Sequence, residues 1–149
     1  MSDIIFTLDG RPVAAKPGET IWQVAKREGV LIPHLCHKDA EGYRPDGNCR
    51  ACMVEIEGER TLAASCIRQP RAGMVVNTAG ERPEAARRMV IELLAADQPA
   101  REDAHDKSSH FWDMADLQGV SDSRFPPIEK ARIPLLDASH VAMRVNLDA

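Results

Sequence analysis

The sequence predicts an α+β fold, in which a small mixed sheet with one short helix precedes a longer helix and an extended arm. Three observations support this prediction. Short strand-like runs separated by glycine turns dominate residues 1–80, a helical apolar period begins at Glu81, and regular periodicity is lost after Pro99. We therefore expect a compact domain over residues 1–80 and a helix with an extended arm over residues 81–149.

The chain opens with a predicted β-hairpin and a short helix. Ile4 to Leu8 is an apolar strand, Asp9-Gly10 is a strong turn sequence, and Pro12 to Ala15 returns as the second strand. Thr20 is a good N-cap, and Gln23 is placed to complete a capping box. The short helix is expected to continue to the next glycine, where its apolar pattern stops.

Three further strands are predicted at Met53–Ile56, Arg60–Ala64 and Gly73–Thr78, giving a sheet of about five strands. The segment Glu57-Gly58-Glu59 is the turn between the first two of them. Antiparallel pairing across this turn would bring the residues before Met53 and those after Ala64 to one end of the sheet. Cysteines flank both strands, so we expect them to meet there.

A longer helix is predicted from Glu81, with Pro83 in its first turn. Its residues divide into an apolar stripe and an opposite charged face, so we expect the stripe to pack on the helix's own domain. The predicted stripe is Ala86, Met89, Val90, Leu93 and Leu94, and the charged residues opposite are Arg87, Arg88 and Glu92.

The last fifty or so residues have little periodicity and are predicted to form a partner-wrapping arm. Residues 108–117 are expected to make one short helix, while Phe125-Pro126-Pro127 and Ile133-Pro134 suit extended backbone. Scattered apolar side chains would lie exposed unless the arm docks on another surface. They are Phe111, Trp112, Leu135, Leu136, Val141 and Met143.

Composition excludes several classes of function. The formal charge of -4 and the absence of a basic stretch argue against nucleic acid as a partner. No apolar run approaches the ~20 residues that span a bilayer, and no leader sequence opens the chain, so we expect a cytoplasmic protein without membrane insertion. In that reducing compartment, cysteines serve as metal ligands or catalytic thiols more often than as disulfides.

The four cysteines are the candidate functional residues. Cys36, Cys49, Cys52 and Cys66 offer one close pair and two distant single thiols. Four thiolates suit either a tetrahedral zinc ion or a 2Fe-2S cluster. Structural zinc sites usually combine two short Cys-x2-Cys knuckles, whereas a long loop, one close pair and a remote ligand is the iron-sulfur pattern. Iron is therefore favoured, and a structural zinc-binding interaction module is the alternative.

The loop before Cys49 also suits a negatively charged cluster. Asp46-Gly47-Asn48 and Gly42 permit the positive φ values that turn backbone N–H groups inward. Arg44 and Arg50 are cations that could offset an added electron, or solvated surface charges. We take Gly47, Asn48 and Arg50 as candidate cofactor-binding residues. No residue is a candidate acid, base or nucleophile, and the chain alone is expected to turn nothing over.

These segments resemble a known family of electron-transfer proteins. IPHLC, PDGNCRACMVEIEG and LAASC followed by GMVVNT are similar to the N-terminal 2Fe-2S domain of three groups. The groups are the large iron-sulfur subunit of NADH dehydrogenase, the diaphorase small subunit of NAD-reducing hydrogenase, and the α subunit of NAD-dependent formate dehydrogenase. The slightly longer first ligand loop, with its insertion over residues 41–45, looks most like the formate dehydrogenase subunit.

The resemblance implies a β-grasp ferredoxin domain with one 2Fe-2S cluster on the four cysteines, and one-electron transfer within a molybdenum or tungsten formate dehydrogenase. The implied partners are a further Fe-S domain, a pterin metal domain and flavin or NADH-oxidising subunits. The 2Fe-2S subunit of a hydrogenase or NADH dehydrogenase, or a free-standing ferredoxin, is the alternative within the class.

The chain departs from this family after the second predicted helix. Respiratory relatives carry a His-x3-Cys-x2-Cys-x5-Cys site there for a 4Fe-4S cluster, but the positions counted from His105 hold Ser109, Trp112 and Gln118. We therefore predict that this second cluster is absent. His34 and His37 bracket Cys36, and we expect them to contact a sulfur through an N–H or to lie in solvent.

Overall fold

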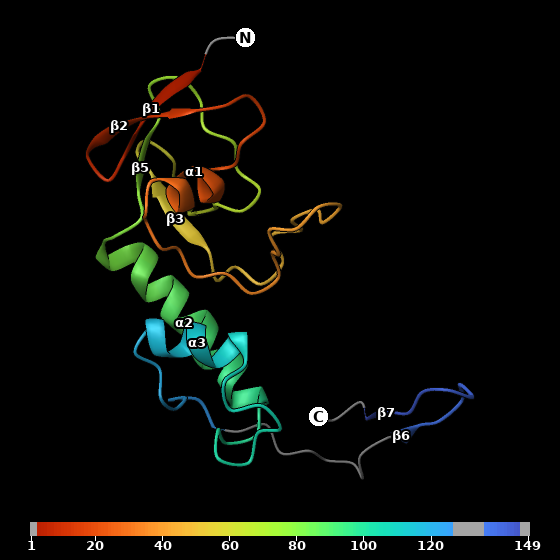
Figure 1. Ribbon diagram of the computed structural model, residues 1–149. Coiled ribbons are helices and arrows are strands. Elements are labelled where there is room, and N and C mark those ends of the chain that lie inside the picture. The colour runs from red at the N-terminus through yellow and green to blue at the C-terminus, as the bar shows by residue number, and fades with distance from the viewer. Residues whose placement is uncertain (1–2, 127–135, 147–149) are drawn as a thin grey trace.

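The computed structural model describes residues 3–126 and 136–146. Its centre is one five-stranded sheet with the strand order β2-β1-β5-β3-β4. The strands are β1 (Ile4–Leu8), β2 (Arg11–Ala15), β3 (Met53–Ile56), β4 (Ala63–Ala64) and β5 (Val75–Asn77). Strand β1 pairs parallel with β5, and the other pairs are antiparallel. The predicted mixed sheet of the α+β class is confirmed (Figure 1).

The hairpin of β1 and β2 follows the predicted turn. Asp9 and Gly10 both have positive φ, 48° and 79°, and this left-handed pair closes a two-residue turn between the strands. Strand β4 is shorter than predicted, because only Ala63 and Ala64 pair with β3. The carbonyl of Arg60, inside the predicted strand, accepts a hydrogen bond from Arg82 instead.

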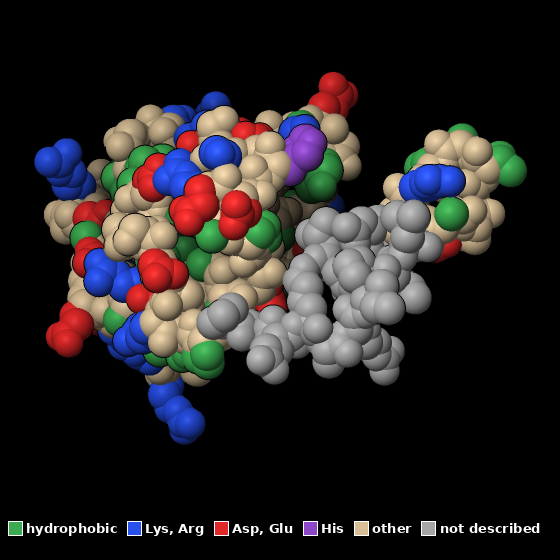
Figure 2. Space-filling view, turned by 90° about the horizontal axis from the view of Figure 1, so that it is seen from below, with side chains coloured by type: hydrophobic (Ala, Val, Ile, Leu, Met, Phe, Trp, Pro, Cys, Tyr) green, Lys and Arg blue, Asp and Glu red, His purple; other side chains and the backbone are tan. Residues whose placement is uncertain are grey.

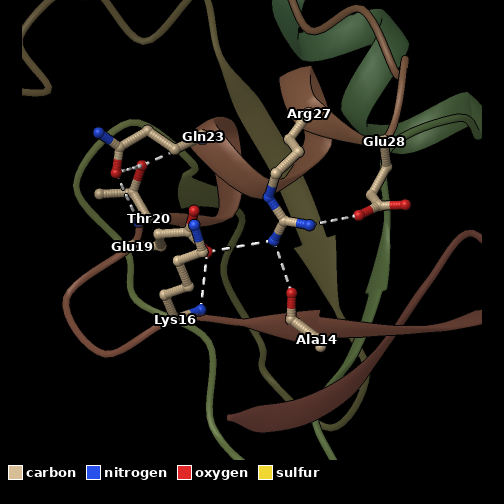
Figure 3. Close-up of polar contacts among 7 residues, drawn as sticks. All are labelled: Ala14, Lys16, Glu19, Thr20, Gln23, Arg27 and Glu28. Carbon is tan, nitrogen blue, oxygen red and sulfur yellow. Dashed lines mark hydrogen bonds and ion pairs between the residues drawn. The ribbon is translucent and has the colours of Figure 1, made fainter.

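Helix α1 (Ile21–Arg27) starts where the capping residues predict. The Thr20 hydroxyl accepts from the backbone N–H of Gln23, and the Gln23 side chain accepts from the backbone N–H of Thr20. At the other end, Arg27 donates to the Ala14 carbonyl of β2 at 2.6 Å and to Glu19 at 3.1 Å (Figure 3). These contacts hold the helix over the sheet in the β-grasp arrangement.

The main core lies between α1 and the sheet. Helix α1 buries one face, and each of the longer strands contributes alternate residues to the same cluster. The largest fully buried members are Phe6, Ile21, Ile32, Val24, Val54 and Val76. Cys52 and Cys66 belong to this cluster, so the end of the sheet that carries them is sealed from water on the core side.

Helix α2 (Glu81–Asp97) forms as predicted and packs on β3, but its buried face differs from the predicted one. Pro83, Arg87 and Ile91, spaced four residues apart, face inward. Met89 and Leu93 of the predicted stripe are 45% and 49% exposed. The stripe was wrong because Arg87, placed on the charged face, finds two carbonyl acceptors inside the protein.

The predicted short helix is present as α3 (His110–Leu117), and it packs on α2. Its residues form a second apolar cluster with Ala51 of the cysteine loop and Ile91 of α2. Trp112 is buried and Phe111 is half-buried, so the expected alternative to exposure, docking on another surface, is met here by the chain's own residues. This part of the predicted arm therefore covers the chain's own cysteine loop.

The two-stranded hairpin of β6 (Leu136–Asp137) and β7 (Val145–Asn146) stands away from the remainder in Figures 1 and 2. Val141 and Met143 at its tip are exposed, as expected. The expected extended segment Ile133-Pro134 and Leu135 fall outside the described residues.

Figure 2 shows lysine, arginine, aspartate and glutamate side chains interspersed on the face seen from below, with no area of a single sign. None of the helices in the described ranges combines the length and apolar character of a bilayer-spanning helix.

The second apolar cluster gives a testable prediction. Replacing Trp112, 6% exposed, with alanine removes the largest side chain of the cluster, and should lower the free energy of unfolding by about 3 kcal/mol. Urea denaturation followed by circular dichroism measures this change. The matched control is Leu117→Ala in the same helix, whose side chain is 40% exposed and should cost less than about 1 kcal/mol. Equal losses for the two variants would contradict burial of Trp112.

Candidate metal centre

Cys52 and Cys66 are brought together by the pairing of β3 with β4. Met53 pairs with Ala64, so Cys52, just before β3, and Cys66, just after β4, emerge at the same end of the sheet. Ser65 strengthens this junction, because its N–H and its hydroxyl both donate to the Cys52 carbonyl, at 3.1 Å and 2.8 Å. The predicted meeting of these two cysteines is confirmed.

Cys36 and Cys49 form a second pair beside the first. The backbone N–H groups of Cys36 and Ala51 both point at the Cys49 sulfur, each with a nitrogen-to-sulfur distance of 3.5 Å. All four cysteines lie in the described ranges, and none is in a disulfide. No three His, Cys, Asp or Glu side chains in those ranges lie close enough together to hold a single metal ion. The thiols are thus arranged as two neighbouring pairs.

The pKa values of the thiols show how strongly they interact. A hydrogen bond from the Cys66 thiol lowers the pKa of Cys52 to about 6, and the same interaction raises the pKa of Cys66. Negative charge on Cys36 and Cys49 raises the pKa of Cys66 further, so all four sulfurs share one electrostatic environment. Four thiolates coexist in such a site only when bound cations compensate their charge.

The candidate cofactor-binding residues of the loop differ in position. Gly47 is buried, with φ of 67°, whereas the side chains of Asn48 and Arg50 are exposed. Arg50 has a φ of 61°, an uncommon value for a residue with a side chain, and it shapes the tight turn from Cys49 to Cys52. Arg44 is exposed and lies 3.6 Å from Asp46, which fits a solvated surface charge.

An aromatic group lies beside Cys36. The rings of His34 and His37 lie 4.6 Å and 4.7 Å from that of Trp22, and these residues line a cavity of about 490 Å³. His37 is 6% exposed, and neither of its ring nitrogens has a hydrogen-bond partner among the described residues. Burial, followed by the nearby His110, lowers the pKa of His34. The burial of His37 contradicts solvent exposure for this residue, and neither of its ring nitrogens donates to a sulfur of the described residues.

The structure also adds residues that the spacing of cysteines did not indicate. Arg87 and Ile91 of α2 and Trp112 of α3 lie against the cysteine loop or the strand that follows it. The sequence signal for this buried face of α2 was the four-residue spacing of Pro83, Arg87 and Ile91. The charge on Arg87 obscures that signal, because a buried face is expected to be apolar. His105 is exposed, and His110 places its Nε2 2.7 Å from the His34 carbonyl.

Comparisons with known proteins agree with this geometry. The chain is 39% identical over 99 residues to the NADH-ubiquinone oxidoreductase 78 kDa subunit of Candida albicans, covering 66% of this chain and 14% of that protein. It is 40% identical over 102 residues to the NADP-reducing hydrogenase subunit HndD of Solidesulfovibrio fructosivorans, covering 66% of this chain and 17% of that protein. The chain thus spans less than a fifth of these relatives.

A solved structure shows the same fold over nearly the whole chain. It is a chain of an NAD+-reducing [NiFe]-hydrogenase in the H2-reduced state, with a TM-score of 0.74 and 30% identity, matching 93% of this chain and 57% of that one. Residues 2–81, which include all four cysteines, match the family model described as a 2Fe-2S iron-sulfur cluster binding domain. With its four thiols gathered at one end of a β-grasp sheet, the chain belongs to this family of 2Fe-2S cluster binding domains.

Proposed function

We propose that Cys36, Cys49, Cys52 and Cys66 are the ligands of the 2Fe-2S cluster and that the chain serves as a one-electron carrier. The observation that carries the assignment is the arrangement of the thiols as two pairs, Cys36 with Cys49 and Cys52 with Cys66. Each pair would hold one iron. A two-iron cluster needs this spread, whereas a single zinc ion needs four thiolates around one centre.

The cluster, when bound, supplies a site that accepts and releases single electrons. The protein's own residues hold the thiolates in place and exclude water. Pairing of β3 with β4 fixes two of the cysteines, and the N–H groups of Cys36 and Ala51 stabilise negative charge on Cys49. Ala51, Cys52 and Cys66 are each at most 1% exposed, so the inner side of the site is dry.

We further propose that the chain works within a multi-subunit NAD-linked oxidoreductase of the NADH dehydrogenase or NAD-reducing hydrogenase type. The relatives of known name support these two complexes. The narrower assignment to a formate dehydrogenase, with its pterin metal domain, rests on the ligand loop over residues 41–45. The expected partners in every case are further Fe-S domains and flavin or NADH-oxidising subunits.

The complex can be identified by activity. The tagged chain, purified under anaerobic conditions from cells that make it, should bring down partner subunits that reduce a viologen dye. Reduction with NADH or H2 and none with formate would support the two named complexes. Dye reduction with formate would favour the narrower assignment. Recovery of the chain alone, with full cluster content, would contradict a role as a subunit and favour a free-standing ferredoxin.

Metal analysis tests the ligand set. Anaerobically purified protein should contain two irons and two sulfides per chain, and should give an S = 1/2 EPR signal after reduction with dithionite. Cys52→Ser should lose most of the iron and visible absorption, since Cys52 is buried and belongs to the inner pair, Cys52 with Cys66. Full iron content in that variant would remove Cys52 from the ligand set. Stoichiometric zinc in the wild type, without a signal after reconstitution, would identify a structural zinc site instead.

Gly47 gives a test of how the loop is held. A Cβ added at Gly47 would lie 2.9 Å from Ile67 Cδ1, next to Cys66, and φ there is left-handed. Gly47→Ala should therefore release iron to a chelator several-fold faster than the wild type. Gly42→Ala is the control, because φ is also positive but nothing lies within 4 Å of its Cβ. Equal release from both variants would show that backbone strain, not the contact with Ile67, decides cluster retention.

A further inference from the structure

Helix α2 inserts a cation next to the cysteine site. Arg87 is 6% exposed, and its Nη1 donates to the Met53 carbonyl at 3.0 Å and to the Thr78 carbonyl at 2.8 Å. Met53 follows Cys52 directly in the chain, so covalent geometry places the guanidinium within roughly 10 Å of the Cys52 sulfur. The cation thus reaches the site from the side of β3 on which α2 packs.

This charge has no direct carboxylate partner in the described part of the chain. The ion pairs found there do not include Arg87, and its Nε makes no hydrogen bond to a described residue. Both acceptors of Nη1 are neutral carbonyls. Burying a cation without a directly bonded counter-ion is costly, and this burial lowers the pKa of Arg87. A negative charge in the same region would offset that cost.

The thiolate of Cys52 is such a charge. It raises the pKa of Arg87, as do the more strongly acting carboxylates of Glu84 and Asp9. A 2Fe-2S cluster on four thiolates is an anion when oxidised and gains one further negative charge when reduced. Reduction by dithionite adds one electron to the cluster, forms and breaks no ligand bond and needs no proton. A cation fixed nearby therefore favours the reduced form over the oxidised form.

We propose that Arg87 raises the reduction potential of the cluster, by presenting a buried positive charge behind Cys52. This inference rests on the proposed role of Cys52 as a ligand. It assigns a part in setting the redox chemistry to Arg87 of α2, which lies beyond the matched residues 2–81. The arginines of the loop lie closer to the cysteines in sequence, but Arg44 and Arg50 are exposed to solvent, which screens their charge.

The test is a redox titration followed by the EPR signal of the reduced cluster, at several fixed ambient potentials. In Arg87→Gln the ratio of reduced to oxidised cluster, measured at the wild-type midpoint, should fall about tenfold, a shift of about 59 mV for one electron. Arg88→Gln is the matched control. It removes the same charge from the next residue of α2, which is exposed, and should change the ratio less than about twofold.

Arg87→Lys separates charge from geometry. Lysine keeps the positive charge but carries it on a compact ammonium at the end of a flexible stem, in place of the planar guanidinium. If the charge sets the potential, the lysine variant should stay near the wild-type ratio even where its thermal stability falls. A lysine variant with full cluster content but the same tenfold loss would overturn the proposal. The lysine variant still decides between charge and geometry if the glutamine variant fails to bind iron.

Iron and sulfide content are measured first on every sample. Absence of a cluster from the wild type would be a failure of the proposed function. A full cluster in Arg87→Gln with an unchanged ratio would overturn only the inference on Arg87, which would then be a structural link between α2, β3 and the end of β5. An equal shift in Arg88→Gln would also overturn it, since burial would then be irrelevant.

Discussion

The pairing of Met53 with Ala64 is the constraint on which the site depends. Strands β3 and β4 share only two residue pairs. This pairing nevertheless determines that Cys52 and Cys66, which are separated by thirteen residues, leave the sheet side by side. The double hydrogen bond from Ser65 to the Cys52 carbonyl reinforces the same junction. A shift of register by one residue would turn one cysteine to the opposite face. The two thiols would then no longer share a cluster.

The pair of Cys36 and Cys49, here called the outer pair, is positioned by a different kind of structure. Cys36 and Cys49 lie on a loop without regular hydrogen bonding, and their position comes from backbone conformation and from packing. Left-handed residues at Gly47 and Arg50 turn the chain, and Ala51 anchors it in the second apolar cluster with Ile91 and Trp112. The inner ligands are thus placed by the sheet, and the outer ligands by contacts with helices α2 and α3.

Much of the fold could be predicted from the sequence, because its signals there are local. The turn at Asp9-Gly10, the capping box at Thr20 and the alternation in β3 each follow from a few neighbouring residues. Cysteine spacing likewise predicted an iron-sulfur site. Strand β4 was predicted too long, because the Arg60 carbonyl bonds to Arg82, far away in the chain.

Which face of α2 is buried could not be predicted from the helix's own residues. Arginine in a helix usually faces water, and Arg87 is buried only because the carbonyls of Met53 and Thr78 lie opposite it. Trp112 presents the same difficulty, since its covering role depends on the distant Ala51. Both cases need knowledge of tertiary contacts that no local pattern contains.

The second apolar cluster also has a consequence for the order in which the protein is made. Ribosomes build a chain from its N-terminus, so all four cysteines emerge before Trp112, which lies forty-six residues beyond Cys66. At ordinary rates of synthesis the delay is roughly two to nine seconds. During that interval the loop around Ala51 is open on the side that α3 later covers. Iron and sulfide delivered to a nascent chain would meet this loop uncovered, whereas in the finished chain Ala51 is fully buried and Cys36 and Cys49 are half-buried.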